Sequence, residues 1–179
     1  MRTYLDHNAT SPLRPGVRDA ILAAMALSGN ASSLHGEGRA ARAVIDEARE
    51  AVACAIGCAP RQIVFTSGGT EANVMALSPS WVEGDGLKRL FISAVEHASV
   101  LQGGGFAPEA IETLPVDADG LIDLAAAEQR FAEWHRASQG APFLVSVMLA
   151  NNETGAVQPV GRIAALARQF GGQIGRAHV

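Results

Sequence analysis

Apolar residues recur along the chain at two spacings, which predict helices and short buried strands. Between residues 39 and 56 they recur every three or four positions, which is typical of one face of an α-helix. Another helix is expected from Pro15 up to Gly29, because proline favours the first helical turn and glycine the position after the last. Further helices are expected up to Leu77 after the Thr66–Glu71 segment, after Asp123 up to Ala137, and over residues 160–170.

Short runs of β-branched and aromatic residues predict strands between these helices. The runs cover residues 62–66, 90–93, 111–116 and 143–149. Strands that alternate with helices indicate βα units, in which neighbouring strands run parallel. The sequence therefore predicts an α/β fold with a mostly parallel central sheet that is flanked by helices.

Composition narrows the class of protein. The chain has 179 residues, of which 48% are apolar and 18% are charged, and this excludes a disordered chain. A net charge of −4 without a basic run argues against a nucleic-acid partner. No apolar run approaches the roughly 20 residues of a membrane span, and Asp6 stands where a signal peptide would be apolar. We therefore expect no membrane association and a cytoplasmic location.

The two cysteines, Cys54 and Cys58, are too few for a disulfide scaffold. No histidine or cysteine cluster lies near them, so the sequence predicts no metal site. Small buried core residues are the favoured interpretation of this pair.

The first polar motif is Thr66-Ser-Gly-Gly-Thr-Glu71, at the junction of a predicted strand and a predicted helix. Backbone N–H groups and the positive end of the helix dipole converge at such a junction, which suits a phosphate group. No lysine follows as in a P-loop, and the G-x-G-x-x-G pattern of dinucleotide sites is missing. An ordinary tight turn is the equally weighted alternative for this motif taken alone.

Two further motifs follow predicted strands, namely Glu96-His97 and Ala150-Asn-Asn-Glu-Thr-Gly155. A histidine at such a position can stack on a planar ring or move a proton, although a lone one is more often a surface residue. The amides either face a ligand or tie down a loop. Because the carboxyl ends of parallel strands share one edge of a sheet, the three motifs together predict a pocket for a phosphorylated aromatic cofactor.

Five sequence blocks resemble the NifS/IscS-type cysteine desulfurases, which belong to the class V aminotransferase group of pyridoxal-phosphate enzymes. The resemblance runs from Tyr4 to about Gly172, and the blocks keep the family's order and spacing. They are Tyr4-Leu-Asp-His-Asn-Ala-Thr10, Asn30-Ala-Ser-Ser-Leu-His-Gly36, Phe65-Thr-Ser-Gly-Gly-Thr-Glu-Ala-Asn73, Glu96-His97 and Ala150-Asn-Asn-Glu-Thr-Gly-Ala-Val-Gln158.

The resemblance implies the type I pyridoxal-phosphate-dependent transferase fold and pyridoxal 5'-phosphate as the cofactor. It implies removal of sulfur from L-cysteine, which gives L-alanine and an enzyme persulfide for iron–sulfur cluster assembly or thiolation. Sulfur-acceptor or scaffold proteins and a homodimer are the implied partners. By position, Gly69 and Thr70 would hold the cofactor phosphate, His97 would stack on the ring and assist proton transfers, and Asn152 would bind the ring's phenolic oxygen.

The chain also departs from the family pattern. Its one lysine, Lys88, does not match the lysine that bonds to the cofactor, and Cys54 and Cys58 do not match the loop cysteine that accepts sulfur. We therefore expect an N-terminal fragment that is inactive by itself. Residues 1–13 would be an arm associated with the small domain, and residues 14–179 the first half of the large cofactor-binding domain.

Residues 174–179 are interpreted as a non-native tail. Gly175 and Arg176 stand where the family has an apolar strand, and one back-translation of the tail coincides with a common sequencing adapter.

Two alternatives for the function stay open. One is another class V enzyme, such as a selenocysteine lyase or an aminotransferase, and the other is a non-catalytic protein that binds a ligand or a partner.

Overall fold

The computed structural model describes residues 3–7, 9–81 and 86–175. The chain divides into two compact units, Met1–Phe65 and Thr66–Val179. Every predicted site residue belongs to the second unit. Within the described residues, no helix is both long and apolar enough to cross a membrane.

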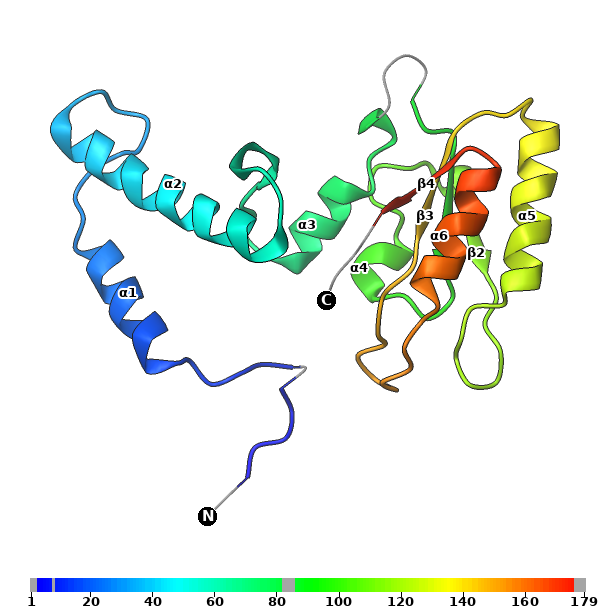
Figure 1. The fold of residues 1–179 in the computed structure, drawn as a ribbon, viewed down its shortest axis with the longest axis horizontal. Coiled ribbons are helices and arrows are strands. Elements are labelled where there is room, and N and C mark those ends of the chain that lie inside the picture. The colour runs from blue at the N-terminus through cyan, green and yellow to red at the C-terminus, as the bar shows by residue number, and fades with distance from the viewer. Residues whose placement is uncertain (1–2, 8, 82–85, 176–179) are drawn as a thin grey trace. The chain divides into compact units, whose positions relative to one another are not determined.

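The first unit contains helices α1 (Pro15–Met25) and α2 (Gly36–Ile56) (Figure 1). Both were predicted; α1 ends at Met25, earlier than expected, whereas the end of α2 at Ile56 is as predicted. α2 begins earlier than expected because His35 caps it, its Nδ1 accepting a hydrogen bond from the Gly38 N–H at 3.3 Å. α2 ends at Gly57, whose φ of 71° is a left-handed conformation that favours glycine.

The predicted strand over residues 62–66 is wrong. A short 3₁₀ helix, η1 (Pro60–Gln62), is followed by irregular chain up to Gly68. A strand needs a hydrogen-bonded neighbour, and this segment does not pair with any strand of the sheet, so Val64 stays 62% exposed.

The expectation of a buried cysteine pair is also wrong for Cys54, which is exposed, while Cys58 is half-buried. The α2 helix buries only Gly38 and Ala53, so the surface around Cys54 lacks the packing that the sequence suggested.

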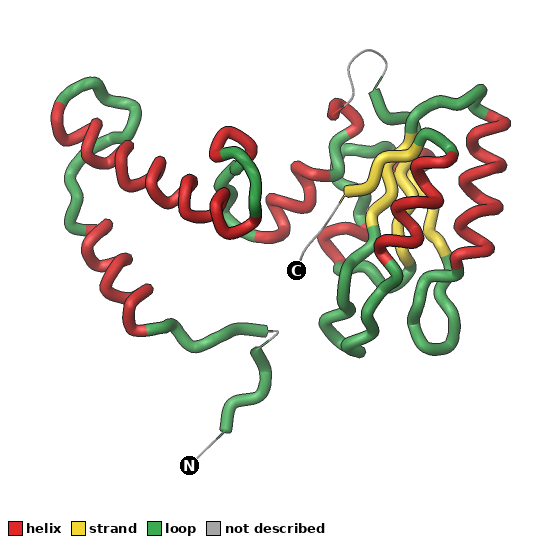
Figure 2. Tube along the Cα trace, in the orientation of Figure 1, coloured by secondary structure: helices red, strands yellow, loops and turns green. Residues whose placement is uncertain are grey.

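The second unit is built on a sheet, drawn in yellow in Figure 2. Its four strands lie in the order β2-β1-β3-β4, and every pairing is parallel. The strands are β1 (Arg89–Ser93), β2 (Ile111–Leu114), β3 (Phe143–Ser146) and β4 (Gly172–Gly175). The helices are α3 (Gly69–Ala76), α4 (Ala98–Leu101), α5 (Leu124–Ala137) and α6 (Val160–Gln169), with 3₁₀ turns η2 (Pro79–Trp81) and η3 (Pro108–Ala110). The predicted α/β class with a parallel sheet is confirmed.

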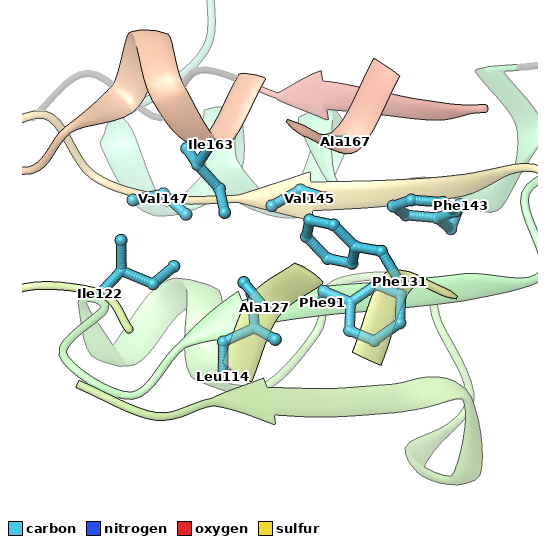
Figure 3. Packing of buried hydrophobic residues seen from close by; sticks show 10 residues of the cluster. All are labelled: Phe91, Leu114, Ile122, Ala127, Phe131, Phe143, Val145, Val147, Ile163 and Ala167. Carbon is cyan, nitrogen blue, oxygen red and sulfur yellow. The ribbon is translucent and has the colours of Figure 1, made fainter. Parts of the chain in front are cut away.

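Each face of the sheet carries its own apolar cluster. Successive side chains of a strand point to opposite faces, so Phe91 of β1 joins one cluster while Leu90 and Ile92 join the other. The helices α5 and α6 cover the first face, and Figure 3 shows their side chains against those of β1 and β3. This cluster comprises Phe91, Leu114, Ile122, Ala127, Phe131, Phe143, Val145, Val147, Ile163 and Ala167.

The strand β4 was not among the predicted elements. Ile174 pairs with Val145 and packs against the first cluster, and Gly175 pairs with Ser146. Gly175 is thus accommodated at the end of a strand, contrary to the expectation that it would disfavour one. Residues 176–179 lie outside the described residues, and a non-native origin of the tail stays a prediction.

Truncation of Phe131 tests the core. Its ring is fully buried and lies 5.0 Å from the Phe91 ring and 5.1 Å from the Phe143 ring, measured between centroids. We expect Phe131→Ala to lower the free energy of unfolding by about 3–5 kcal/mol, measured by urea denaturation followed by circular dichroism. Phe65→Ala, the same truncation at a ring that is 49% exposed, should cost less than half as much. Equal losses would contradict the assigned core.

Candidate functional site

Two loops meet at the carboxyl ends of β1 and β3. Because the two strands are adjacent and parallel, the segment after Ser93 lies beside the segment after Ser146. The Asn151 Nδ2 donates a hydrogen bond to the Val95 carbonyl at 3.0 Å, which joins the two segments directly. They line a pocket of about 430 Å³, formed by Val95, Glu96, His97, Ala98, Asn151, Asn152, Glu153 and Thr154.

The two asparagines of this loop have different surroundings. Asn151 Oδ1 accepts hydrogen bonds from the N–H groups of Glu153 and Thr154, both at 2.9 Å, and its Nδ2 binds Val95. Asn151 therefore ties the loop down. Asn152 donates from Nδ2 to the Glu153 carboxylate at 2.8 Å, an exposed contact between sequence neighbours. Of the two alternatives for this motif, loop anchoring thus applies to Asn151, and Asn152 remains the candidate ligand residue.

Glu96 is a buried carboxyl in the lining of the pocket, with 6% of its surface exposed. Its Oε1 is buried and has no hydrogen-bond partner. Hydrogen bonding from the backbone N–H groups of Met148 and His97 favours the charged form of this carboxyl group. Burial outweighs these two bonds and raises the pKa of Glu96 above its ordinary 4.5.

His97 is the N-cap residue of α4 and its ring is held by hydrogen bonds to Nδ1. Ser99 N–H donates to this nitrogen at 3.1 Å, and Ser99 Oγ lies 2.8 Å from it. Ser99 Oγ in turn accepts from Asn73 Nδ2 at 2.8 Å. Asn73 belongs to α3, so these contacts connect α3 with the histidine. No pattern in the sequence links Asn73 with Ser99, because the two residues lie 26 positions apart.

The Thr66–Glu71 motif opens α3 as predicted. Its N-cap residue, Gly68, offers no side chain to the first helical turn, and a Cβ built on Gly68 or Gly69 would have no atom within 4 Å. The backbone N–H groups of Gly69 and Thr70 begin the helix, where such groups have no intrahelical acceptor. The loop therefore presents accessible donors at the positive end of a helix dipole.

The Glu71 carboxylate occupies one of the backbone N–H donors of this loop, that of Ser67. Its Oε2 accepts the Ser67 N–H at 2.6 Å, and a hydrogen bond with the Ser67 side chain and this backbone bond lower the pKa of Glu71. Ser67, which belongs to the motif predicted to bind phosphate, is thus engaged by the Glu71 carboxylate. Glutamate at the third helical position, reaching back to the turn before the helix, is the signal that could have revealed this contact.

These residues fit a phosphorylated aromatic cofactor. Uncapped N–H groups of Gly69 and Thr70 suit a phosphate, the exposed His97 imidazole suits a ring, and the Asn152 amide suits a ring oxygen. Asn73 stands one helical turn after Gly69 and, through Ser99, joins the phosphate end to the ring end. Among the described residues, no group of three or more His, Cys, Asp or Glu side chains could hold a metal ion.

Lys88 lies at the wrong edge of the sheet for this site. Its N–H donates to the Pro142 carbonyl just before β1, whereas His97 follows the carboxyl end of the same strand. A five-residue strand separates the two edges by about 16 Å, at about 3.3 Å per residue. The expectation that Lys88 is not the cofactor-bonding lysine agrees with this placement.

Comparison with known proteins identifies the family. Residues 3–174 match the aminotransferase class-V family. The chain belongs to the class V aminotransferase family. This class V chain is 38% identical over 176 residues to the IscS-like cysteine desulfurase of Mycobacterium tuberculosis, an alignment that covers 94% of the chain and 44% of the relative. A cysteine desulfurase of Cereibacter sphaeroides is 40% identical over 180 residues, which cover 95% of the chain and 44% of that protein.

Solved structures agree with this family and fold. The NifS-like protein of Rickettsia africae superimposes with a TM-score of 0.80 at 32% identity, over 97% of the class V chain and 46% of that structure. SspA in complex with cysteine gives a TM-score of 0.79 at 30% identity, over 98% of this chain and 50% of SspA. The predicted resemblance and fold class are confirmed. The class V chain spans less than half of the length of the curated relatives that it matches.

Replacement of each asparagine tests their separation into an anchor and a ligand residue. We expect Asn151→Ala to lower the free energy of unfolding by about 1–3 kcal/mol, because the Val95 carbonyl and two backbone N–H groups lose their partner. Asn152→Ala is the matched control and should change it by less than about 0.5 kcal/mol. Urea denaturation measures both, and equal losses would contradict the anchoring role.

The raised pKa of Glu96 predicts that the free energy of unfolding depends on pH. A folded-state pKa above the unfolded value of 4.5 means that the folded chain binds more protons, so this group's stability contribution is present below pH 4.5 and is lost as pH rises through the folded pKa. Glu96→Gln mimics the protonated carboxyl. We expect the variant to gain stability relative to the parent as pH increases from 4.5 to 8, measured as the difference in urea midpoint at each pH. A difference independent of pH would refute the assignment.

Proposed function

We propose that this chain supplies the phosphate-binding and ring-binding side of a pyridoxal-phosphate-dependent cysteine desulfurase. The observation that carries the proposal is the placement of His97 and Asn152 beside one pocket, with α3 linked to His97 through Asn73 and Ser99. The names of the curated relatives and the cysteine complex of SspA support L-cysteine as the substrate.

Each residue has a defined role in this proposal. The N–H groups of Gly69 and Thr70 bind the cofactor phosphate, the His97 ring covers the pyridine ring, and the Asn152 amide donates to its phenolic oxygen. When bound, pyridoxal phosphate supplies an electron sink that weakens bonds at the carbon bearing the substrate amine. The chain's own residues orient the ring and fix where its oxygen and phosphate lie.

The complete reaction requires groups from outside these 179 residues. Lys88 lies at the opposite edge of the sheet from His97, so a lysine outside this chain bonds to the cofactor in our proposal. A cysteine outside it accepts sulfur from L-cysteine, and L-alanine is released. The sulfur of the persulfide then passes to an acceptor or scaffold protein for iron–sulfur cluster assembly or thiolation.

We further propose a cytoplasmic homodimer, with residues 1–13 as an arm of the small domain and residues 14–179 within the cofactor domain.

A chimaera tests this function. Residues 3–174 replace the matching segment of the Mycobacterium tuberculosis IscS-like cysteine desulfurase, which retains its own remaining sequence. We expect the chimaera to bind pyridoxal phosphate and to form L-alanine from L-cysteine. His97→Ala in the chimaera should lower kcat by about 100-fold, because the ring loses its platform. Alanine formation measured by chromatography gives the rate.

Two controls test whether the effect is specific to the site and to the substrate. Lys88→Arg in the chimaera should leave the rate unchanged, since Lys88 lies away from the pocket. The same chimaera assayed with L-selenocysteine and with amino-group acceptors separates desulfurase activity from the other class V reactions. A chimaera that binds the cofactor but forms no alanine from L-cysteine would reject the proposed substrate.

A further inference from the structure

The hydrogen bonds at His97 fix which ring nitrogen carries the proton. The Ser99 backbone N–H lies 3.1 Å from Nδ1, and a backbone N–H can only donate. Nδ1 must therefore present its lone pair in this arrangement. In the neutral imidazole the proton then resides on the other nitrogen, Nε2.

The serine hydroxyl acts in the same direction. Ser99 Oγ accepts from Asn73 Nδ2 at 2.8 Å and lies 2.8 Å from His97 Nδ1. Because the amide nitrogen can only donate to Oγ, the single hydroxyl proton is available for Nδ1. The donors thus run one way, from Asn73 to Ser99 and from Ser99 to His97.

Burial of Asn73 and Ser99 makes it costly to reverse the direction of hydrogen-bond donation. Asn73 and Ser99 are each 8% exposed, whereas His97 itself is exposed at the pocket. A hydrogen bond in such a poorly solvated place is stronger than in water, and a donor that faces another donor there is costly. A proton on Nδ1 in the other neutral tautomer would face the Ser99 N–H.

We propose that Asn73 and Ser99 are positioning residues that hold neutral His97 in the Nε2–H tautomer. His97 then presents a hydrogen-bond donor to the pocket, and its basic nitrogen is turned towards the protein. The histidine accordingly serves as a ring platform and donor, and the neutral ring does not act as a base through Nε2. The meaning for catalysis rests on the proposed desulfurase function, whereas the tautomer is a property of the chain alone.

Nitrogen NMR of the histidine ring tests the proposal. Long-range ¹H–¹⁵N correlation spectra of the ¹⁵N-labelled 179-residue chain at pH 8 distinguish protonated from unprotonated ring nitrogens. We expect His97 Nδ1 to resonate as an unprotonated nitrogen and Nε2 as a protonated one. The reverse assignment in the unaltered chain would overturn the proposal without any variant.

The Asn73→Asp variant reverses the relay at nearly constant shape. A carboxylate accepts the Ser99 hydroxyl proton, so Ser99 Oγ is left to accept from a protonated Nδ1. We expect the ratio of Nδ1–H to Nε2–H tautomer to rise about tenfold, the effect of about one hydrogen bond. An unchanged ratio would contradict the relay.

Two matched controls separate the relay from a general structural effect. Asn73→Asp combined with Ser99→Ala should have the ratio of Ser99→Ala alone, because no hydroxyl remains to transmit the change. Ser93→Ala removes another buried serine hydroxyl, whose contact is with the Val95 N–H at 3.4 Å, and should leave the His97 tautomer unchanged. A shift in either control would show that the relay is not the cause.

The two proposals fail in different measurements. The tautomer is measured without cofactor or substrate, so it can be refuted while the chimaera still forms alanine. A chimaera without activity, together with a confirmed Nε2–H tautomer, would instead reject the proposed function and leave the positioning role intact.

Discussion

Parallel pairing of β1 with β3 is the constraint on which the whole site depends. The two strands share a register in which Phe91 lies opposite Val145, so their carboxyl ends lie at one edge of the sheet, at the spacing of neighbouring strands, about 4.8 Å. An antiparallel pair would send the two following loops to opposite edges. The aromatic cluster on one face keeps this register, because a slip by one residue would turn Phe91 and Phe143 away from α5 and α6.

The polar side chains at this edge of the sheet differ in what they bind. Asn151 uses its amide on four partners, the Glu153 and Thr154 N–H groups, the Val95 carbonyl and the Met148 sulfur. The N–H groups of Met148 and His97, which belong to the same two loops, favour the charged form of the buried Glu96 carboxyl. The partners of Asn151 compensate its burial, whereas the buried Glu96 Oε1 has no partner and burial raises the pKa of Glu96. In the proposed function, Asn152 and His97 of these two loops are the residues that contact the ligand.

Local signals in the sequence predicted most elements but not all of them. The helix after Asp123 was predicted, and in the structure Asp123 caps it by accepting hydrogen bonds from the Ala125 and Ala126 N–H groups. Residues 62–66 have strand composition, yet a strand requires a neighbour, which composition does not reveal. The strand β4 begins at Gly172, where a side chain would collide with the Phe143 ring. Only the fold shows why glycine belongs there, and the contact of Asn73 with Ser99 is equally invisible in sequence.

The helix α3 connects the two ends of the candidate site. Its first turn carries Gly69 and Thr70, with Glu71 engaging Ser67, and Asn73 follows within about 6 Å along the axis, at 1.5 Å per residue. Through Ser99, Asn73 sets the orientation of the His97 ring. Any rotation of α3 that moved the first turn, which is proposed to bind phosphate, would therefore also move the Asn73 amide that donates to Ser99. A single short helix thus links the two groups that are proposed to bind phosphate and ring, although 28 positions of sequence separate Gly69 from His97.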